Sequence, residues 1–297
     1  MISVSDDDLE QAAAVFNEVR PRLFGIAYRM LGSASEAEDI VQDVWLRWQL
    51  ADRSVVLNPA AYLATATTRL AINATQSARV RREAYIGPWL PEPVDTSADP
   101  YLGAERGEAL EFAVLLLMER LSPNERAAYV LREAFDYPYS QIADILQLNE
   151  PAVRQLVSRA RKHVDGERRI AVDAAEQQRL LTAFVNAAKS GDLLELEGLF
   201  APDVTSVSDG NGKARASKFP VVGSERVAKF FRSFHTRFWV GVETVWTQMN
   251  GGPALIVIAD GNIRNIITVS ASAEGIYRVN VQMNPDKLQR ANAALAR

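Results

Sequence analysis

The chain has 297 residues, of which 48% are hydrophobic and 24% are charged, a composition typical of a soluble globular protein with two or three domains. It contains no cysteine and only two histidines, which excludes disulfides, thiolate metal sites and histidine-rich zinc sites. The net charge of −4 leaves nucleic-acid binding open, because such binding depends on local basic patches rather than on the total charge.

Nothing in the hydropathy pattern indicates a membrane protein. No apolar run reaches the ~18 residues that a membrane-spanning helix needs. The longest, Phe112–Met118, lies between Glu111 and Glu119, and we expect a buried helix there. The segment 6–10 is acidic, whereas a secretory signal begins with basic residues. We therefore expect a cytoplasmic protein with no membrane partner.

Residues 9 to 84 show helical periodicity. Apolar side chains recur at intervals of three and four residues, as at Ile40, Val41, Val44 and Trp48. The segment Gly32–Ser35 interrupts the pattern, and Ser35 followed by Glu38 resembles a capping box that starts the next helix. A further helix is predicted to open at Asn58, with Pro59 in its first turn.

Residues 85–107 are rich in proline and glycine and predict a linker. Within it, the sequence Trp89-Leu90-Pro91-Glu92-Pro93 is unusual for a spacer, because it carries a large aromatic side chain. Two interpretations remain open for this segment: a stiff spacer with one anchoring tryptophan, or a segment that docks onto a neighbouring domain.

After the linker, helices are predicted from 108 to 170 and again to about 200, where they end near Phe200-Ala201-Pro202. The pattern then changes to strands. Residues 254–259 form a β-rich run, and alternating segments follow at 263–272 and 276–283 with turn residues between them. Helices followed by antiparallel hairpins predict an α+β domain.

The most specific pattern lies between Pro138 and His163. A short amphipathic helix is predicted around Ile142–Leu146, followed by a tight turn at Leu148–Glu150 in which Asn149 is a good N-cap for the next helix. In that second helix one face is apolar, with Val153, Leu156, Val157 and Ala160. The opposite side carries Arg154, Ser158, Arg161 and Lys162. This arrangement predicts a helix-turn-helix whose second helix enters a major groove.

The recognition helix and its continuation are basic. Between residues 154 and 169 the chain has six basic side chains against two acidic ones: Arg154, Arg159, Arg161, Lys162, Arg168 and Arg169 against Asp165 and Glu167. The alternative is a solvated charged face on an ordinary helix pair. The coincidence of turn, cap and basic stripe favours DNA binding.

A second polar and basic group ends the first helical region. It comprises Arg69, Asn73, Gln76, Arg79, Arg81 and Arg82. Such residues can hold a phosphate backbone, and Tyr85 just beyond can stack on an exposed base. A basic helix end is also common for a simpler reason, since it complements the helix macrodipole.

Together these segments resemble the sigma factors of bacterial RNA polymerase. The sequence from Ala37 to Trp45 looks like the region-two helix that docks on the polymerase clamp, and the resemblance implies that Asp39, Gln42 and Asp43 are its polar contacts. Residues 59–63 and 69–73 resemble the following helices, which melt and read the −10 element. Asn73 stands where many sigma factors have aspartate.

The helix-turn-helix resembles sigma region four, which reads the −35 element. The resemblance covers roughly residues 9 to 168 and lacks the other regions of housekeeping factors, as in the extracytoplasmic-function group. We expect the promoter-contacting residues of this helix to be Arg154, Gln155, Ser158, Arg159, Arg161 and Lys162.

Three further segments resemble one subgroup of these factors, which has a SnoaL-like C-terminal domain. They are the linker motif, the loop Asp209-Gly210-Asn211-Gly212-Lys213 and the segment Asn284-Pro285-Asp286-Lys287-Leu288. The second usually reads Asp-Gly-Gly-Gly, and Asn211 tolerates the left-handed backbone that glycine adopts there. We expect regulatory contacts from Trp89, Pro91, Asp209, Gly210, Lys213, Asn284 and Asp286.

The expected architecture is therefore a multidomain chain of two all-α sigma domains followed by an α+β, cone-shaped SnoaL-like domain. Residues 1–84 would form sigma region two, 85–107 the linker, 108–170 sigma region four with the helix-turn-helix, and 171–297 the regulatory domain.

The C-terminal domain raises the question of catalysis. Acid–base candidates are His235, Asp209 and Asp260, but His235 lies in an aromatic segment where a lone histidine is more often packed than catalytic. We expect no enzymatic activity and no cofactor. Regulation is favoured, and a small ligand could act only by binding one arrangement of the chain better than another.

Three functions are compatible with these patterns. The first is a transcription initiation factor whose partners are the RNA polymerase core and promoter DNA. The second is a stand-alone regulator with a ligand-sensing domain, and the third is an enzyme fused to a DNA-binding domain. The segment Asp39–Asp43 favours the first, since a repressor has no use for a polymerase-docking helix. The sequence leaves the small ligand unidentified.

Overall fold

The structure, a computed structural model, describes residues 6–96 and 111–295, without the side chains of residues 6, 7, 79–81, 294 and 295. The described chain divides into two compact units. One comprises residues 6–83 and 114–167, and the other comprises residues 84–96, 111–113 and 168–295.

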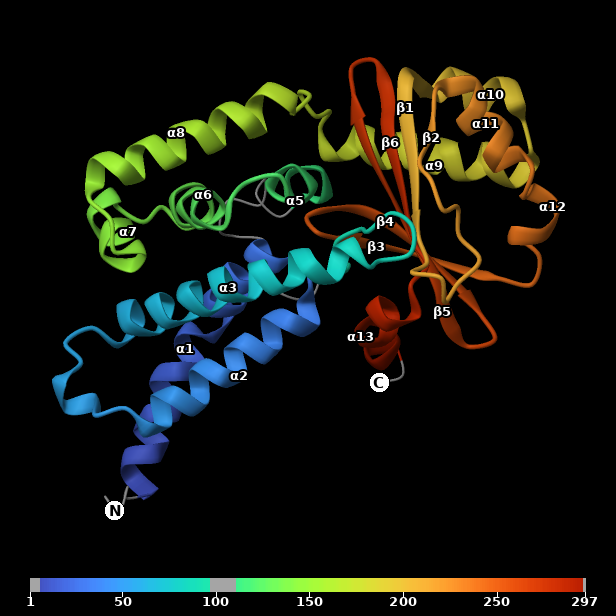
Figure 1. Ribbon diagram of the computed structural model, residues 1–297. Coiled ribbons are helices and arrows are strands. Elements are labelled where there is room, and N and C mark those ends of the chain that lie inside the picture. Colours follow the sequence, from blue (N-terminus) through green and yellow to red (C-terminus); the bar gives the residue numbers. More distant parts are fainter. Residues whose placement is uncertain (1–5, 97–110, 296–297) are drawn as a thin grey trace. The chain divides into compact units, whose positions relative to one another are not determined.

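The first unit is helical. Its N-terminal part contains α1 (Asp6–Leu31), α2 (Ala34–Leu50), the 3-10 turn η1 (Arg53–Val55) and α3 (Pro59–Glu83), drawn in blue and cyan in Figure 1. Helix α1 packs against both α2 and α3. Leu23, Ile26 and Leu63 are fully buried in this part, and the indole of the buried Trp48 donates a hydrogen bond to the carbonyl of Ala12 at 3.1 Å.

The remaining helices of this unit are α5 (Phe112–Met118), α6 (Pro123–Tyr129), the π-helical turn η3 (Val130–Ala134), α7 (Tyr139–Leu146) and α8 (Glu150–Glu167). The first residues of α5 belong to the second unit. A capping box formed by Ser122 and Glu125 starts α6, which packs along α8. Helix α5 coincides with the apolar run predicted to be a buried helix.

The second unit is an α+β domain. It contains α9 (Ala174–Ser190), α10 (Leu193–Leu199), β1 (Phe200–Asp209), β2 (Val221–Val222), α11 (Ser224–Arg232), α12 (His235–Phe238), β3 (Glu243–Met249), β4 (Gly252–Ala259), β5 (Asn262–Ser272), β6 (Gly275–Gln282) and α13 (Pro285–Leu295). The strands form one sheet in the order β2-β1-β6-β5-β4-β3, and α9 and α11 pack against it (Figure 1).

Consecutive strands from β3 to β6 are antiparallel, as predicted, whereas β1 lies parallel to β6. The parallel pairing aligns Asp209, the last residue of β1, with Gln282, the last residue of β6. It therefore brings the loop after β1 to the same edge of the sheet as the segment after β6, although 73 residues separate Asp209 and Gln282 along the chain.

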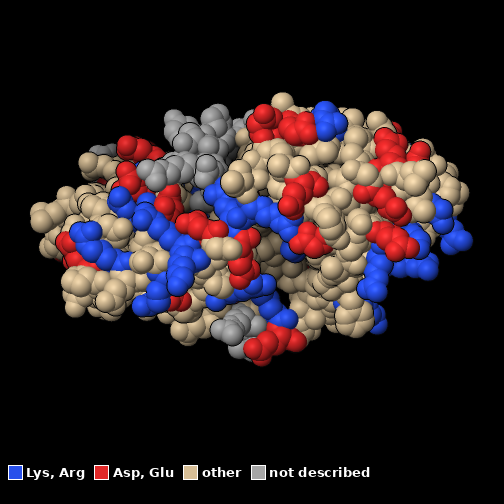
Figure 2. Space-filling view, turned by 90° about the horizontal axis from the view of Figure 1, so that it is seen from above, with Lys and Arg blue, Asp and Glu red and all other residues tan. Residues whose placement is uncertain are grey.

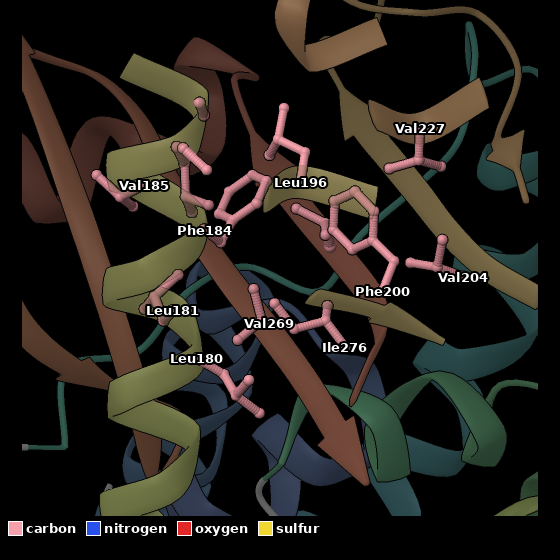
Figure 3. Close-up of a cluster of buried hydrophobic side chains, with 14 of the residues drawn as sticks. Leu180, Leu181, Phe184, Val185, Leu196, Phe200, Val204, Val227, Val269 and Ile276 are labelled. Atoms are coloured by element: carbon pink, nitrogen blue, oxygen red, sulfur yellow. The ribbon is translucent and has the colours of Figure 1, made fainter. Parts of the chain in front are cut away.

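One face of the sheet carries the main core of this unit. Phe184 of α9 and Phe200 of β1 lie with ring centroids 6.0 Å apart, among aliphatic side chains from α9, α10, α11 and the sheet (Figure 3). A smaller cluster includes Ile256, Ile266 and Leu288, so α13 covers part of the sheet with Leu288. The predicted fold class, two helical regions followed by an α+β domain, is confirmed.

Two local expectations need correction. Helix α2 is capped by Ser33, whose hydroxyl accepts from the backbone N–H of Glu36 at 3.3 Å, and Ser35 lies inside the helix. The basic run after Arg154 does not continue along α8, because α8 ends at Glu167 and Arg168 and Arg169 belong to the second unit. The bounds of the four predicted segments remain a prediction. No helix within residues 6–96 and 111–295 is long and apolar enough to cross a membrane.

Candidate nucleic-acid interface and regulatory contact

The predicted polymerase-binding residues lie on the outer edge of α2. Asp39, Gln42 and Asp43 are exposed, and the helix buries its other side through Ile40, Val41, Val44 and Trp48. The periodicity of the apolar positions fixes this orientation, because the buried side must pack on α1. The three polar side chains are therefore available to a partner.

Two apolar side chains extend this edge, and the sequence reasoning missed them. Leu46 and Leu50 are 56% and 88% exposed. They follow Asp39 and Asp43 by seven residues each, which is two helical turns. The signal was present in the sequence, since both leucines fall outside the buried periodicity of α2. An exposed stripe of carboxylates and leucines is typical of a protein-binding surface.

Among the predicted −10 contacts, Asn73 and Gln76 are exposed on α3. The hydrogen bond from the Ala61 N–H to Asn58 Oδ1, 3.0 Å long, caps this helix at the predicted position. The side chains of Arg79 and Arg81 lie outside the described residues.

The other two arginines of this group make contacts inside the first unit. Arg69 donates through Nε to the carbonyl of Ile145 at 3.0 Å and through Nη2 to that of Asp144 at 3.3 Å, at the end of α7. Arg82 donates to the carbonyl of Leu31 at 2.5 Å and pairs with Glu119. In this arrangement both guanidinium groups hold α3 to neighbouring elements.

Glu119 also pairs with a second arginine. Its Oε1 lies 2.6 Å from Nη1 of Arg126, whose side chain is 1% exposed. Arg126 donates through Nε to the carbonyl of Arg29 at 3.0 Å, which ties α6 to α1. Burial lowers the pKa of Arg126 to about 9.

The helix-turn-helix has the predicted geometry. The side-chain oxygen of Asn149 accepts from the N–H of Ala152 at 2.9 Å and caps α8, and Gln147 ends α7 in the left-handed region with φ 55°. The buried face of α8 contains Val153, Leu156, Val157, Ala160 and Val164. The predicted DNA-contacting residues are all exposed: Arg154, Gln155, Ser158, Arg159, Arg161 and Lys162.

Two arginines of α8 bond carboxylates on other helical segments of this unit. Arg159 bonds Glu125 at 2.8 Å, and Arg161 makes a two-pronged contact with Glu133 at 2.7 and 3.0 Å. The bond from Arg159 is the main cause that lowers the pKa of Glu125, and the bond to Glu133 raises the pKa of Arg161. Figure 2, seen from above Figure 1 and thus from the side of α8, shows basic side chains over this unit with acidic ones between them.

In the second unit, Asp209 is the centre of a buried polar cluster. Its side chain is fully buried, and Oδ2 accepts from the Leu90 N–H at 2.9 Å and from Lys287 Nζ at 2.7 Å. Oδ1 accepts from the hydroxyl of Tyr85 at 2.5 Å. The three sequence motifs therefore meet at one carboxylate. They are the linker motif, the loop that begins at Asp209 and the C-terminal segment.

The residues around Asp209 complete this cluster. Asn284 donates to the Tyr85 hydroxyl at 2.7 Å, and Lys287 Nζ lies 4.4 Å from the ring centroid of Trp89. Burial raises the pKa of Tyr85 far above its ordinary value, and the hydrogen bond to Asp209 acts in the same direction. The sequence reasoning missed Tyr85 and Lys287 in this role, although Lys287 lies in the recognised C-terminal motif.

The remaining residues of the expected contact lie close by. The Pro91 carbonyl accepts from Gln282 at 3.4 Å, and Lys213 pairs with Asp286 at 2.5 Å. A Cβ on Gly210 would lie 2.8 Å from the carbonyl of Ala214, so only glycine fits without a shift. Asn211 has φ 46°, the left-handed backbone expected of it.

The linker continues along the same unit beyond Asp209. Val94 exchanges two hydrogen bonds with Asn250, one to its Oδ1 at 3.1 Å and one from its N–H at 2.9 Å. Asp95 then forms an antiparallel bridge with Met249 at the end of β3. Residues 84–96 are therefore a docked part of the second unit rather than a stiff spacer with one anchoring tryptophan.

The acid–base candidates of the C-terminal domain show no catalytic grouping. His235 is half-buried, and a Cβ on Gly191 would lie 2.9 Å from its ring, so the imidazole packs on backbone. Asp209 belongs to the polar cluster, and Asp260 lies in the turn between β4 and β5. Among the described residues, no three His, Asp or Glu side chains gather as metal ligands.

A cavity of about 140 Å³ lies elsewhere in the second unit, lined in part by Gln177, Asn250 and Tyr277. Burial raises the pKa of Tyr277. The cavity carries none of the predicted site residues, so it does not identify a ligand.

The fold and these surfaces define a DNA-binding protein of the transcription machinery, and comparison with known proteins gives its family. The family model for Sigma-70 region 2 matches residues 15–81, and that for Sigma-70, region 4 matches residues 111–164. The ECF RNA polymerase sigma factor SigJ of Mycobacterium tuberculosis is 39% identical over 233 residues, which cover 76% of this chain and 74% of the relative.

A second relative covers nearly the whole chain. The probable ECF RNA polymerase sigma factor SigI of M. tuberculosis is 30% identical over 292 residues, 96% of this chain and 98% of the relative. The crystal structure of M. tuberculosis SigJ aligns with a TM-score of 0.75 and 32% identity, over 93% of this chain and 97% of that one. The chain belongs to the ECF RNA polymerase sigma factors.

Membership of this family determines the general function. The protein is a transcription initiation factor, not an enzyme, and it acts with the RNA polymerase core on promoter DNA. The match to SigJ also includes the α+β domain, which agrees with the SnoaL-like fold expected for it. The alternative of a stand-alone ligand-sensing regulator is not favoured.

Proposed function

We propose that this protein selects promoters through α8, holds −10 DNA through α3 and binds the polymerase core through the outer edge of α2. The exposed basic face of α8 on a capped helix-turn-helix is the observation that carries this proposal. A side chain that makes a two-pronged base contact typically contributes about 1–3 kcal/mol of discrimination. Transcription initiation by this protein would take place in the cytoplasm, where RNA polymerase acts.

Run-off transcription with purified core polymerase tests the function directly. The expected result is a product from a cognate promoter that depends on this chain. Arg154→Ala should change base preference in a promoter library randomised at the −35 element, because it removes one exposed guanidinium from α8. Unchanged preference would remove Arg154 from the interface, and tight specific binding by the free chain without polymerase would favour a stand-alone regulator.

The α2 edge is tested by Asp43→Arg. Asp39, Gln42 and Asp43 lie within about one helical turn, so a reversed charge at the centre of this edge should repel a basic partner surface. We expect loss of co-purification with core polymerase while the helical circular-dichroism spectrum is retained. Glu18→Arg, an equal charge reversal on the exposed side of α1, is the matched control and should co-purify normally.

We further propose that the C-terminal domain tunes promoter output by holding the linker. The linker leads from α3 towards α5, and residues 84–96 are bound to the second unit through Asp209, Lys287 and Asn250. A domain that fixes the linker restricts the paths open to the helical regions on either side, which is a coupling of about 1–3 kcal/mol in typical regulated proteins.

Three variants test this regulatory contact. Trp89→Ala, Asp209→Ala and deletion after Gln282 should each change reporter output at matched protein levels without changing −35 preference. Wild-type output from all three would refute regulation by this contact and would return attention to an enzymatic or ligand-sensing role for the domain.

A further inference from the structure

The ring of Tyr139 contacts two guanidinium groups in the first unit. The guanidinium carbon of Arg154, on α8, lies over the ring 4.2 Å from its centroid, and that of Arg132, in η3, lies 5.0 Å from it. Both distances are within the ~6 Å range of cation–π contacts. Tyr139 is the half-buried first residue of α7, so its ring is fixed by the helix-turn-helix itself.

The contacts of the Arg154 guanidinium differ from those of the other arginines of α8. Arg159 donates through Nε to Glu125 at 2.8 Å, and Arg161 donates through Nε and Nη2 to Glu133 at 3.0 and 2.7 Å. A ring contact uses the face of a guanidinium and leaves its in-plane donors available. The carboxylate near Arg154 belongs to Glu150, at the longer distance of 3.4 Å.

We propose that Tyr139 positions Arg154 for a base contact and thereby sets promoter preference at one base pair of the −35 element. A two-pronged contact with the edge of a guanine needs the guanidinium in one plane, and an arginine free in solvent must be ordered to provide it. The tyrosine ring provides this order before DNA arrives. The inference rests on the proposed role of α8 in reading the promoter.

The hydroxyl of Tyr139 makes no hydrogen bond to any residue that the structure describes. The aromatic face is therefore the functional feature of this side chain. Tyr139→Phe should keep wild-type preference, whereas Tyr139→Leu and Tyr139→Met should lose it. Tyr139→Met is a second variant without an aromatic ring, for use if the Tyr139→Leu variant does not fold.

The experiment measures run-off products from a library randomised at the −35 element, with holoenzyme made from wild type, the Tyr139 variants, Arg154→Ala and the double variant Tyr139→Leu/Arg154→Ala. We expect Tyr139→Leu to relax preference at the same base pair as Arg154→Ala, by roughly tenfold. The double variant should be no worse than Arg154→Ala alone, because residues that act as a unit are not additive. Preference at the −10 element should not change.

Several outcomes separate the possibilities. If Arg154→Ala relaxes the preference and neither ring-free variant does, the positioning role is wrong while the promoter-reading role stands. Additive effects in the double variant, or a Phe variant as impaired as the Leu variant, would also overturn it. Glu150→Gln is the matched control, and relaxation by this variant alone would assign the positioning to Glu150. Absence of any wild-type product would instead contradict the proposed function.

Discussion

The contacts that hold region two to region four in the first unit differ in kind from those that hold the linker in the second. In the first unit, half-exposed arginines reach backbone carbonyls at helix ends, as Arg69 does at Ile145. In the second, a fully buried carboxylate, that of Asp209, bonds Leu90, Tyr85 and Lys287. The first kind of contact can be exchanged for water with little loss, whereas the second cannot.

This difference indicates which contact opens more readily. Arg69 and Arg82 are predicted to hold promoter DNA, yet both are occupied inside the first unit. If these arginines contact phosphates as predicted, phosphate oxygens replace their present partners in region four, Ile145 for Arg69 and Glu119 for Arg82. The linker can stay on the C-terminal domain during that change, because none of its bonds to Asp209 involves these arginines.

Asp209→Ala should have the largest effect on stability. Removing one partner of a buried ion pair leaves the other charge unpaired, and the lysine here, Lys287, is only 11% exposed. We expect the free energy of unfolding to fall by about 3–5 kcal/mol, measured by urea denaturation of the full chain. Lys213→Ala is the control, since its pair with Asp286 is exposed and should contribute less than about 1 kcal/mol. Equal losses in the two variants would contradict the buried role of Asp209.

Glu119→Gln should have the next largest effect. Glu119 pairs with the fully buried Arg126 and with Arg82, and its own side chain is 19% exposed. We expect a loss of about 2–4 kcal/mol in the free energy of unfolding, because Arg126 would keep a buried charge without a counter-ion. The exposed pair of Arg120 and Glu167 supplies the control, and Glu167→Gln should change stability by less than about 1 kcal/mol. If Glu119→Gln left the free energy of unfolding unchanged, water would be taking the place of the carboxylate beside Arg126.

Arg69→Ala should have the smallest effect and is the most direct probe of the contact between the two regions. Loss of its two bonds to carbonyls should cost about 1 kcal/mol. Hydrogen exchange should become faster in α7 while protection of the Leu90 and Val94 amides stays unchanged. Gln76→Ala, at an exposed position of the same helix, should alter neither. Faster exchange at Leu90 as well would mean that the linker and the contact between the two regions open together.

Several features followed from short stretches of sequence. The cap at Asn149, the buried face of α8 and the exposed edge at Asp39–Asp43 depend on residues within a few turns of one another, so periodicity and capping rules predict them. The strands from 254 onward were predicted for the same reason. The misplaced cap at Ser35 shows the limit of such rules, because Ser33 offers the same chemistry two residues earlier.

Other features depended on the tertiary structure. Leu90 and Asp209 are 119 residues apart, and Arg69 and Ile145 are 76 apart, so no local pattern connects them. The sequence marked Asp209 as a motif residue, but only the parallel pairing of β1 with β6 places its carboxylate beside Gln282 and the linker. Likewise, the sequence identified Arg69 as a basic residue that could hold a phosphate backbone, and the packing of α7 against α3 decided that its guanidinium is occupied. Local interactions determine where helices begin and which face they bury, whereas the partners of a charged side chain depend on where distant parts of the chain come together.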